Sequence, residues 1–259
     1  MPIVTITSDW NNQDYYAGSI KGRIVSLVPD ANIIDINHNI PAFKLAQAAF
    51  IVRNTYKNFP AKTIHLLCIN SEQSADKKHL IVKYDDHYFL STDNGILGLV
   101  CNDDEKIAEV YEYKDEIENK SFSVLDAFPV MVKAITENTI KNIANKKESF
   151  DRHVPMRPVF EDNVISGSVI YIDSYKNIIT NITRTLFNDV GKNRKFEILV
   201  QSNHYKINRI NTSYYETSVG ELLALFNSLN LLEIAIKDGN AADLLSINLN
   251  SVIRIKFLN

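Results

Sequence analysis

Apolar residues in the first half of the chain alternate between two spacings, and this alternation limits the fold more than any other feature. Continuous apolar or β-branched runs over residues 3–6, 33–36 and 64–69 predict strands, and the intervals between them predict helices. The helical stripes consist of Tyr16, Ile20, Ile24, Leu27 and Val28, and then of Leu45, Ala48, Ala49, Val52 and Tyr56. This strand–helix–strand order predicts an α/β domain with a mostly parallel sheet over residues 1–148.

The pattern changes near residue 148. Residues 149–163 contain Pro155 and Pro158 and have no periodicity, as is typical of a linker. Short β-type runs separated by Gly, Asn, Asp or Ser follow, and in the last of them Ile253 and Ile255 alternate with charged residues. We therefore expect a smaller, all-β, barrel-like domain over residues 164–259.

Composition and charge exclude several classes of partner. The 259 residues are 45% hydrophobic and 23% charged, which is ordinary for a globular protein, and the net charge of −3 provides no positive field for nucleic acid. No apolar stretch approaches the roughly 18 residues of a membrane-spanning helix, and the first residues do not resemble a signal peptide. We expect a cytoplasmic protein without a nucleic-acid or membrane partner.

The cysteines and histidines indicate no metal site. Cys68 and Cys101 have neither metal-ligand nor disulfide spacing, so small buried thiols are expected. The histidines are scattered without acidic or thiol partners, and His38 is interpreted as a structural residue at the end of a strand.

Polar side chains follow the predicted strands of the first domain. Asp9 comes after the first strand, Asp14 opens the first helix, and residues 35–38 end the second strand. Ligands of open α/β sheets bind at this carboxyl edge, where two carboxylates can accept the hydroxyls of a ribose. Asp is also common in turns and at helix N-caps, so a capping role for Asp9 and Asp14 remains open.

Two further polar segments have a structural and a functional interpretation. Residues 92–95 contain Asn-Gly, a strong turn signal. Residues 173–177 form either a simple hairpin loop or a site, in which Tyr175 stacks on a base and the amide of Asn177 pairs with an adenine edge. The sequence contains neither a Walker loop nor GxGxxG, so nothing supports a phosphate cradle.

A set of short motifs resembles the S-adenosyl-L-methionine (SAM) hydrolases, the SAM hydroxide adenosyltransferase family, to which the fluorinase and chlorinase also belong. Each motif is weak alone, but their order is specific and extends from residue 3 to about residue 242. The motifs are Ser8-Asp9-Trp10, Asp14, Asp35-Ile36-Asn37-His38-Asn39-Ile40, Phe59-Pro60, Ile64-His65-Leu66, Thr92-Asp93-Asn94-Gly95, Asp173-Ser174-Tyr175-Lys176-Asn177, Asn227-Ser228 and Gly239-Asn240-Ala241-Ala242.

The resemblance implies a fold, an assembly and a reaction. It implies an α/β domain followed by a β-barrel, and a homotrimer with active sites between the first domain of one subunit and the second domain of its neighbour. Water or halide attacks C5′ of SAM in line with the sulfonium, methionine leaves, and with water the other product is adenosine. No metal or organic cofactor takes part, because the sulfonium is already an activated leaving group and the protein mainly orients the nucleophile.

The resemblance also implies roles for individual residues. Asp9 and Asp14 would face the ribose and methionine part of SAM, and Phe43 would pack on the ribose and sulfonium region. The remaining substrate-binding positions lie in the second domain. They are Tyr175 and Tyr214, which would sandwich adenine, Asn177, which would read its edge, Ser228, which would meet the methionine end, and Asp173 in the same loop as Tyr175.

The chain departs from the family at the catalytic positions. Where the hydrolases hold water with Asp, Arg and His, this sequence has Asn70, Lys77 and Ser123. Asn70 can bind water but cannot stabilise a neighbouring cation, and Ser123 cannot act as a base near neutral pH. Glu72 and His79 lie close by in the sequence, and we hypothesise that one of them replaces the base.

Two alternatives to a hydrolase remain. A non-catalytic sensor or sink would bind SAM or adenosine through Asp14, Tyr175 and Asn177 without needing the three catalytic positions. A halogenase of the same family also lacks the water-holding residues, but the charged Lys77 and the polar loop around it argue against a tight, apolar halide pocket.

Overall fold

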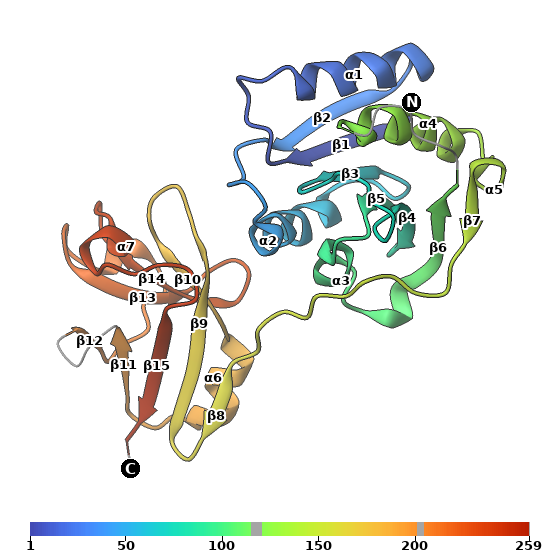
Figure 1. Cartoon of the computed structure of the whole chain (residues 1–259). Helices are drawn as coiled ribbons and strands as arrows, with labels where there is room; N and C mark the ends of the chain where they lie inside the picture. The colour runs from blue at the N-terminus through green and yellow to red at the C-terminus, as the bar shows by residue number, and fades with distance from the viewer. Residues whose placement is uncertain (115–120, 201–204, 259) are drawn as a thin grey trace. The chain divides into compact units, whose positions relative to one another are not determined.

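The computed structural model describes residues 1–114, 121–200 and 205–258. The chain divides into two compact units, Met1–Pro155 and Met156–Asn259, and the division falls within the segment expected to be a linker. Each unit has its own hydrophobic core, and each is described separately (Figure 1).

The N-terminal unit is a mixed sheet with helices on both faces. Within its described residues the sheet has seven strands in the order β2-β1-β3-β5-β4-β6-β7. The strands are β1 (Ile3–Ser8), β2 (Asn32–Asn37), β3 (Ile64–Cys68), β4 (His79–Tyr84), β5 (His87–Thr92), β6 (Ile107–Tyr113) and β7 (Ala144–Lys146). β2, β1, β3 and β5 are parallel neighbours, and β4, β6 and β7 extend the sheet with antiparallel pairs. The expected α/β sheet is confirmed, with an antiparallel extension at one side.

Helices cover both faces of the sheet (Figure 1). The helices are α1 (Tyr16–Leu27), α2 (Leu45–Thr55), α3 (Ile96–Val100), α4 (Ser123–Thr136) and α5 (Ile140–Ile143), with 3-10 turns at Tyr56–Asn58 and Asp104–Lys106. Ile20 of α1 and Phe128 of α4 belong to one core cluster, whereas Ala48 of α2 and Leu97 of α3 belong to the other. β3 lies between the two cores and is buried along its length, which explains its continuous apolar sequence.

The β4–β5 hairpin shows how local sequence sets the sheet order. Asp85 and Asp86 both adopt left-handed backbone conformations, with φ of 50° and 61°, as a tight two-residue hairpin turn requires. The hairpin returns β5 to lie beside β3 in parallel, so β4 is placed on the outer side of β5. The carboxyl ends of β1, β2, β3 and β5 therefore meet at one edge of the sheet.

The C-terminal unit is a barrel-like antiparallel sheet, as expected. Its strands are β8 (Val159–Glu161), β9 (Val164–Ile172), β10 (Ile178–Thr183), β11 (Phe196–Val200), β12 (Tyr205–Ile207), β13 (Leu222–Phe226), β14 (Leu231–Ile236) and β15 (Val252–Phe257). They follow the order β12-β11-β15-β9-β10-β14-β13, with β8 beside β9. Alternate residues such as Ile234 and Ile255 point into the core. The unit also contains α6 (Arg184–Gly191), α7 (Ala241–Leu244) and a 3-10 turn at Tyr214–Glu216.

Within the part of the chain that the structure describes, none of the helices combines the length and apolar character needed to cross a membrane.

Candidate functional site

The carboxyl edge of the parallel strands is organised around Asp9. Oδ2 of Asp9 accepts hydrogen bonds from the backbone amides of Phe43 at 2.9 Å and of Asn70 at 3.3 Å. Phe43 lies in the segment between β2 and α2, and Asn70 lies just after β3, so one carboxylate ties together loops from two strand ends. The N-cap interpretation of Asp9 is wrong, because neither amide belongs to a helix.

Both residues held by Asp9 have strained backbones. Phe43 has φ of 66° and Asn70 has φ of 46°, and such conformations are costly for side chains other than Gly and, to a lesser extent, Asn. The ring of Phe43 is 69% exposed, so packing within this unit does not explain why an aromatic residue occupies this position. Strain and an exposed aromatic ring at one strand-end loop are typical of a ligand-binding site.

The structure places Asp14 and Lys77 at exposed positions near this edge. Asp14 accepts a hydrogen bond from the side chain of Asn11 at 3.2 Å, and the N-cap of α1 is Tyr15, which makes no side-chain capping bond. The N-cap interpretation of Asp14 is therefore wrong as well. Lys77 is exposed in a turn in which its amide donates to the hydroxyl of Ser74 at 3.2 Å.

Glu72, Ser123 and His79 form a hydrogen-bonded chain. Oε2 of Glu72 lies 3.3 Å from both the backbone nitrogen and Oγ of Ser123, the first residue of α4. Nε2 of His79 lies 3.0 Å from the same Oγ, and Nδ1 of His79 lies 3.1 Å from Oγ1 of Thr92. The hydroxyl of Thr92 in turn donates to the carbonyl of Ser71 at 2.6 Å. The fold thus brings together the two hypothesised bases and one of the three catalytic positions.

Within this hydrogen-bonded chain, His79 and Glu72 have different environments. His79 is fully buried, and burial lowers its pKa to about 3, with a smaller contribution from the charge of Lys78. Glu72 is exposed on the loop after β3, and partial desolvation raises the pKa of its carboxyl while the hydrogen bonds from Ser123 oppose that rise. Near neutral pH the imidazole of His79 is neutral, and only Glu72 meets solvent.

The Asn94-Gly95 turn has the structural role expected of it. The side-chain amide of Asn94 donates to the carbonyls of Ile69 at 2.9 Å and Asn70 at 3.0 Å, and Gly95 has φ of 92°. The turn therefore fixes the loop that begins at Asn70. His38 is also structural: its Nδ1 lies 2.6 Å from Oγ of Ser8, and its Nε2 lies 3.0 Å from Oδ1 of Asp35.

In the C-terminal unit, Asp173 organises the loop between β9 and β10. Its Oδ1 accepts from the amides of Tyr175 at 2.9 Å and Asn177 at 2.8 Å, and its Oδ2 accepts from the side chain of Asn177 at 3.1 Å. Asn177 is buried, whereas the ring of Tyr175 is 75% exposed. The loop thus holds one aromatic face outward beside a fixed amide, as stacking and edge recognition of a base require.

Tyr214 and Asn227, the neighbour of Ser228 in the sequence, contact a buried carboxylate that the sequence analysis missed. The phenol of Tyr214 and the side-chain amide of Asn227 both donate to Glu233, which is buried in the middle of β14. Burial and the contact with Glu233 raise the pKa of Tyr214, and the charge of Asp173 contributes. Ser228 is exposed in the β13–β14 turn, next to Asn227. The isolated acidic residue in the apolar run LLEIAI was the available signal for Glu233.

Some of the residues expected to bind adenine and methionine make no contact with one another within the C-terminal unit. Among the described residues no ring contact joins Tyr175 to Tyr214. Tyr175 precedes the Ile178 end of β10, whereas the turn that carries Ser228 lies near its Thr183 end, because Thr183 pairs with Leu231. Within the described residues no group of three or more His, Cys, Asp or Glu side chains is placed to hold a metal ion.

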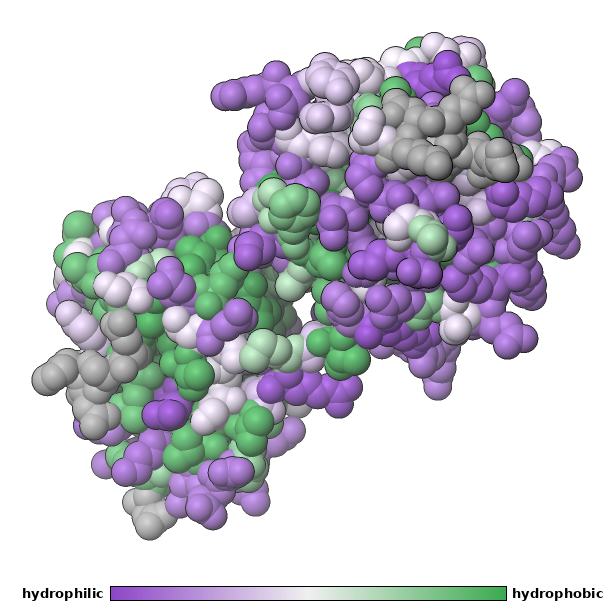
Figure 2. All heavy atoms as spheres, in the orientation of Figure 1, coloured by the Kyte–Doolittle hydropathy of each residue, from purple (hydrophilic) through white to green (hydrophobic). Residues whose placement is uncertain are grey.

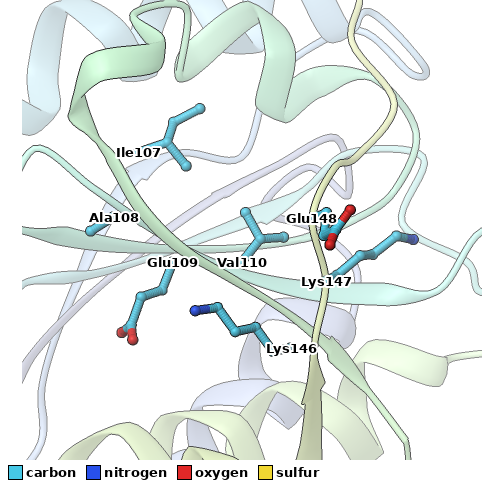
Figure 3. A pocket seen from close by; sticks show the side chains of 7 residues that line it. All are labelled: Ile107, Ala108, Glu109, Val110, Lys146, Lys147 and Glu148. Carbon is cyan, nitrogen blue, oxygen red and sulfur yellow. The ribbon is translucent and has the colours of Figure 1, made fainter.

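A separate depression lies at the edge of the N-terminal sheet (Figure 3). Its volume is about 570 Å³, and β6 and the residues after β7 line it. The lining residues are Ile107, Ala108, Glu109, Val110, Lys146, Lys147 and Glu148, and none of them is an expected site residue.

Comparison with known proteins agrees with both halves of the structure. The N-terminal domain model of the SAM hydroxide adenosyltransferases matches residues 4–144, and the C-terminal domain model matches residues 167–254. A protein named (R)-S-adenosyl-L-methionine hydrolase from Methanocaldococcus jannaschii is 27% identical over 98% of this chain and 96% of its own. One of the same name from Salinispora tropica is 20% identical over 98% and 97%.

Two solved structures share the fold. An uncharacterised conserved protein from Thermotoga maritima superposes with a TM-score of 0.87 at 25% identity, over 98% of this chain and 99% of its own. A conserved hypothetical protein from Thermus thermophilus gives a TM-score of 0.76 at 18% identity over the whole of both chains. With both domain models matched in order along the sequence, the chain belongs to the SAM hydroxide adenosyltransferase family.

Proposed function

We propose that the protein hydrolyses S-adenosyl-L-methionine to adenosine and L-methionine. The observation that carries this proposal is the match of both family domains, in order, over residues 4–144 and 167–254. The relatives matched over nearly their whole length are named hydrolases of the (R) form of SAM, so the (R) sulfonium is the first substrate to test.

The reaction proceeds by attack of water at C5′, with methionine leaving through its thioether sulfur. It uses no metal or organic cofactor, since the sulfonium is already activated. Asp9, Asp14 and Phe43 bind the ribose and sulfonium part, and Asn70 and Lys77 contact the attacking water. The strained, exposed Phe43 and its clamp by Asp9 support the first assignment. Orientation of water and exclusion of bulk solvent supply the rate enhancement.

Adenine binds to the C-terminal unit. Tyr175 and Tyr214 stack on its two faces, the amide of Asn177 reads its edge, and Ser228 binds the methionine end. The carboxylate of Asp173 supports this arrangement because it fixes the backbone of Tyr175 and both the backbone and the side chain of Asn177.

The working assembly is a cytoplasmic homotrimer. Exposed apolar side chains on the C-terminal unit support association, because apolar surface gathered on one part of a protein is typical of interaction sites. Figure 2 shows apolar surface gathered on this unit, and its exposed apolar side chains include Val159 and Phe160 of β8, Tyr205 of β12 and Val252 of β15. Light scattering coupled to size-exclusion chromatography tests the trimer: a monomer at micromolar concentration would contradict it.

The activity is tested by incubating the purified protein with (R)-SAM and with (S)-SAM, in buffers with and without chloride, and separating the products by chromatography. Equal amounts of adenosine and methionine that disappear in Asp14→Ala establish the hydrolase. A chlorinated nucleoside that forms only with chloride would establish a halogenase instead. Saturable adenosine binding without any product would establish a binding protein.

A further inference from the structure

The hydrogen-bonded chain that starts at Glu72 lacks one hydrogen when Glu72 is ionised. Four successive contacts make up the chain: Glu72 to Ser123, Ser123 to His79, His79 to Thr92, and Thr92 to the carbonyl of Ser71. Each contact requires one hydrogen. The two hydroxyls and a neutral imidazole supply three hydrogens in total, and neither the carboxylate nor the carbonyl supplies any. The count of three is the same for both neutral tautomers of His79, and uptake of a single proton supplies the fourth hydrogen.

The environment of the chain decides which end holds that proton. An imidazolium at His79 would complete the chain, but His79 is fully buried and burial lowers its pKa to about 3. A protonated Glu72 also completes it: Glu72 donates to Ser123, Ser123 to Nε2 of His79, and Nδ1 of His79 to Thr92. Glu72 is exposed, and desolvation raises the pKa of its carboxyl, so the proton enters and leaves at Glu72.

We infer that Glu72 accepts the proton of the attacking water and that His79 and Thr92, acting through the hydroxyl of Ser123, are positioning residues that favour its protonated form, whereas the hydrogen bonds that Ser123 donates to ionised Glu72 oppose this. This inference rests on the proposed hydrolysis. The water oxygen forms a bond to C5′ while the C5′–S bond breaks and its electron pair stays on the methionine sulfur. One proton of the water moves to the Glu72 carboxylate, and solvent later removes it. Glu72 lies two residues beyond Asn70, on the loop at the carboxyl edge of the sheet.

Other charged or titratable groups also face this carboxylate and contribute to its titration. The phenol of Tyr16 in α1 interacts electrostatically with Glu72, and the carboxylate of Asp14 interacts electrostatically with the same phenol. His79 faces it from β4 through Ser123, the first residue of α4, and Asp76, Lys77 and Lys78 lie on its own loop.

The test compares Glu72→Gln with Asp76→Asn, which removes a second exposed carboxylate from the same loop. Glutamine keeps an oxygen that can accept from the amide of Ser123, so the loop fold is retained. General-base catalysis contributes at least about 100-fold, so we expect kcat of Glu72→Gln to fall by about 100-fold with KM within about threefold. Asp76→Asn should match the wild type. The decline of kcat at low pH should disappear in the residual activity of Glu72→Gln only.

A second variant tests the hydrogen-bonded chain from Glu72 to Ser71. In His79→Asn the amide nitrogen takes the place of Nδ1 and can donate to Thr92, but no atom replaces Nε2. The hydroxyl of Ser123 is then free to donate to ionised Glu72, so the chain is complete without an extra proton. We expect the low-pH decline of kcat to move to lower pH. A structural role for His79 would leave its midpoint unchanged.

Two outcomes overturn the inference without affecting the proposed function. One is a Glu72→Gln protein that hydrolyses SAM within about threefold of the wild-type kcat. The other is an unshifted midpoint in His79→Asn. Absence of adenosine from the wild-type protein would instead refute the proposed function.

Discussion

The Oδ2 atom of Asp9 and the backbone amide of Phe43 lie 2.9 Å apart, and this contact holds an exposed aromatic residue in a left-handed conformation. Glycine adopts that conformation without the steric cost of roughly 1 kcal/mol that other residues incur. Phe43→Gly should therefore leave the free energy of unfolding unchanged or raise it by up to about 1 kcal/mol. The same change should raise KM for SAM at least about fivefold, because it removes the contact with SAM that we propose for the ring.

Lys62→Gly is the matched control for Phe43→Gly. Lys62 is also exposed and left-handed, with φ of 68°, but it lies in the turn before β3. Urea denaturation should show a similar change in stability for both variants, and only Phe43→Gly should change KM. An unchanged KM in Phe43→Gly would refute the binding role of Phe43.

Removing the Asp9 carboxylate should destabilise the edge of the sheet. Asp9→Ala leaves the amides of Phe43 and Asn70 without their acceptor, and loss of hydrogen bonds to a charged group costs about 2 kcal/mol. Asp9→Asn can present an oxygen at the same place and should lose about half as much. Equilibrium urea unfolding measures both values. Equal stability of Asp9→Ala and the wild type would show that the clamp contributes nothing.

The phenol of Tyr214 should stabilise the C-terminal unit through Glu233. In Tyr214→Phe the buried carboxylate of Glu233 retains the amide of Asn227 but loses the hydroxyl, which should cost about 2 kcal/mol. Tyr215→Phe is the control, because Tyr215 is 87% exposed and should change stability by less than about 0.5 kcal/mol. The same pair tests ligand binding by calorimetry with adenosine, and only Tyr214→Phe should weaken it. Equal stability of the two variants would contradict the role of Glu233.

Stability should fall as the pH decreases below about 6.5. Burial lowers the pKa of both His65 and His79 to about 3, and unfolding returns each to its ordinary value near 6.5. Between these values the unfolded chain binds protons that the folded chain does not, so each histidine removes about 1.4 kcal/mol of stability per pH unit. Above about pH 6.5 both histidines are neutral in the folded and in the unfolded chain, so this loss of stability is absent.

Urea unfolding between about pH 7.5 and 5.0 checks this slope in a range where most carboxylates stay ionised. His65→Asn should remove only part of it, since His79 remains and burial also lowers the pKa of His87. A flat stability profile over this range would contradict the assigned protonation states.

The periodicity of the sequence was sufficient to predict both units but not the order of strands in the first. β4 and β5 read as a hairpin, yet nothing local shows that β5, rather than β4, pairs with β3, since that choice depends on packing against α2 and α3. The short helix α6 was missed, although Thr183 caps it by accepting from the amide of Leu186 at 3.1 Å and Leu186, Phe187 and Val190 have helical spacing.

Side-chain partners were harder to predict than backbone elements. Asp9 and Asp14 fit the N-cap preference, but the fold uses Asp9 to join loops that are distant in sequence, and α1 begins without a side-chain cap. The contact of Glu72 with Ser123 spans 51 residues and depends on where α4 begins. Such contacts follow from tertiary packing, which residue spacing does not encode.

The central claim is attack of water at C5′ of SAM, and isotope labelling tests it most directly. The protein is incubated with (R)-SAM in water enriched in ¹⁸O, and the products are analysed by mass spectrometry. Hydrolysis at C5′ predicts one ¹⁸O atom in the 5′-hydroxyl of adenosine and none in methionine. Unlabelled adenosine, a label in the methionine fragment, or no cleavage at all would contradict the claim.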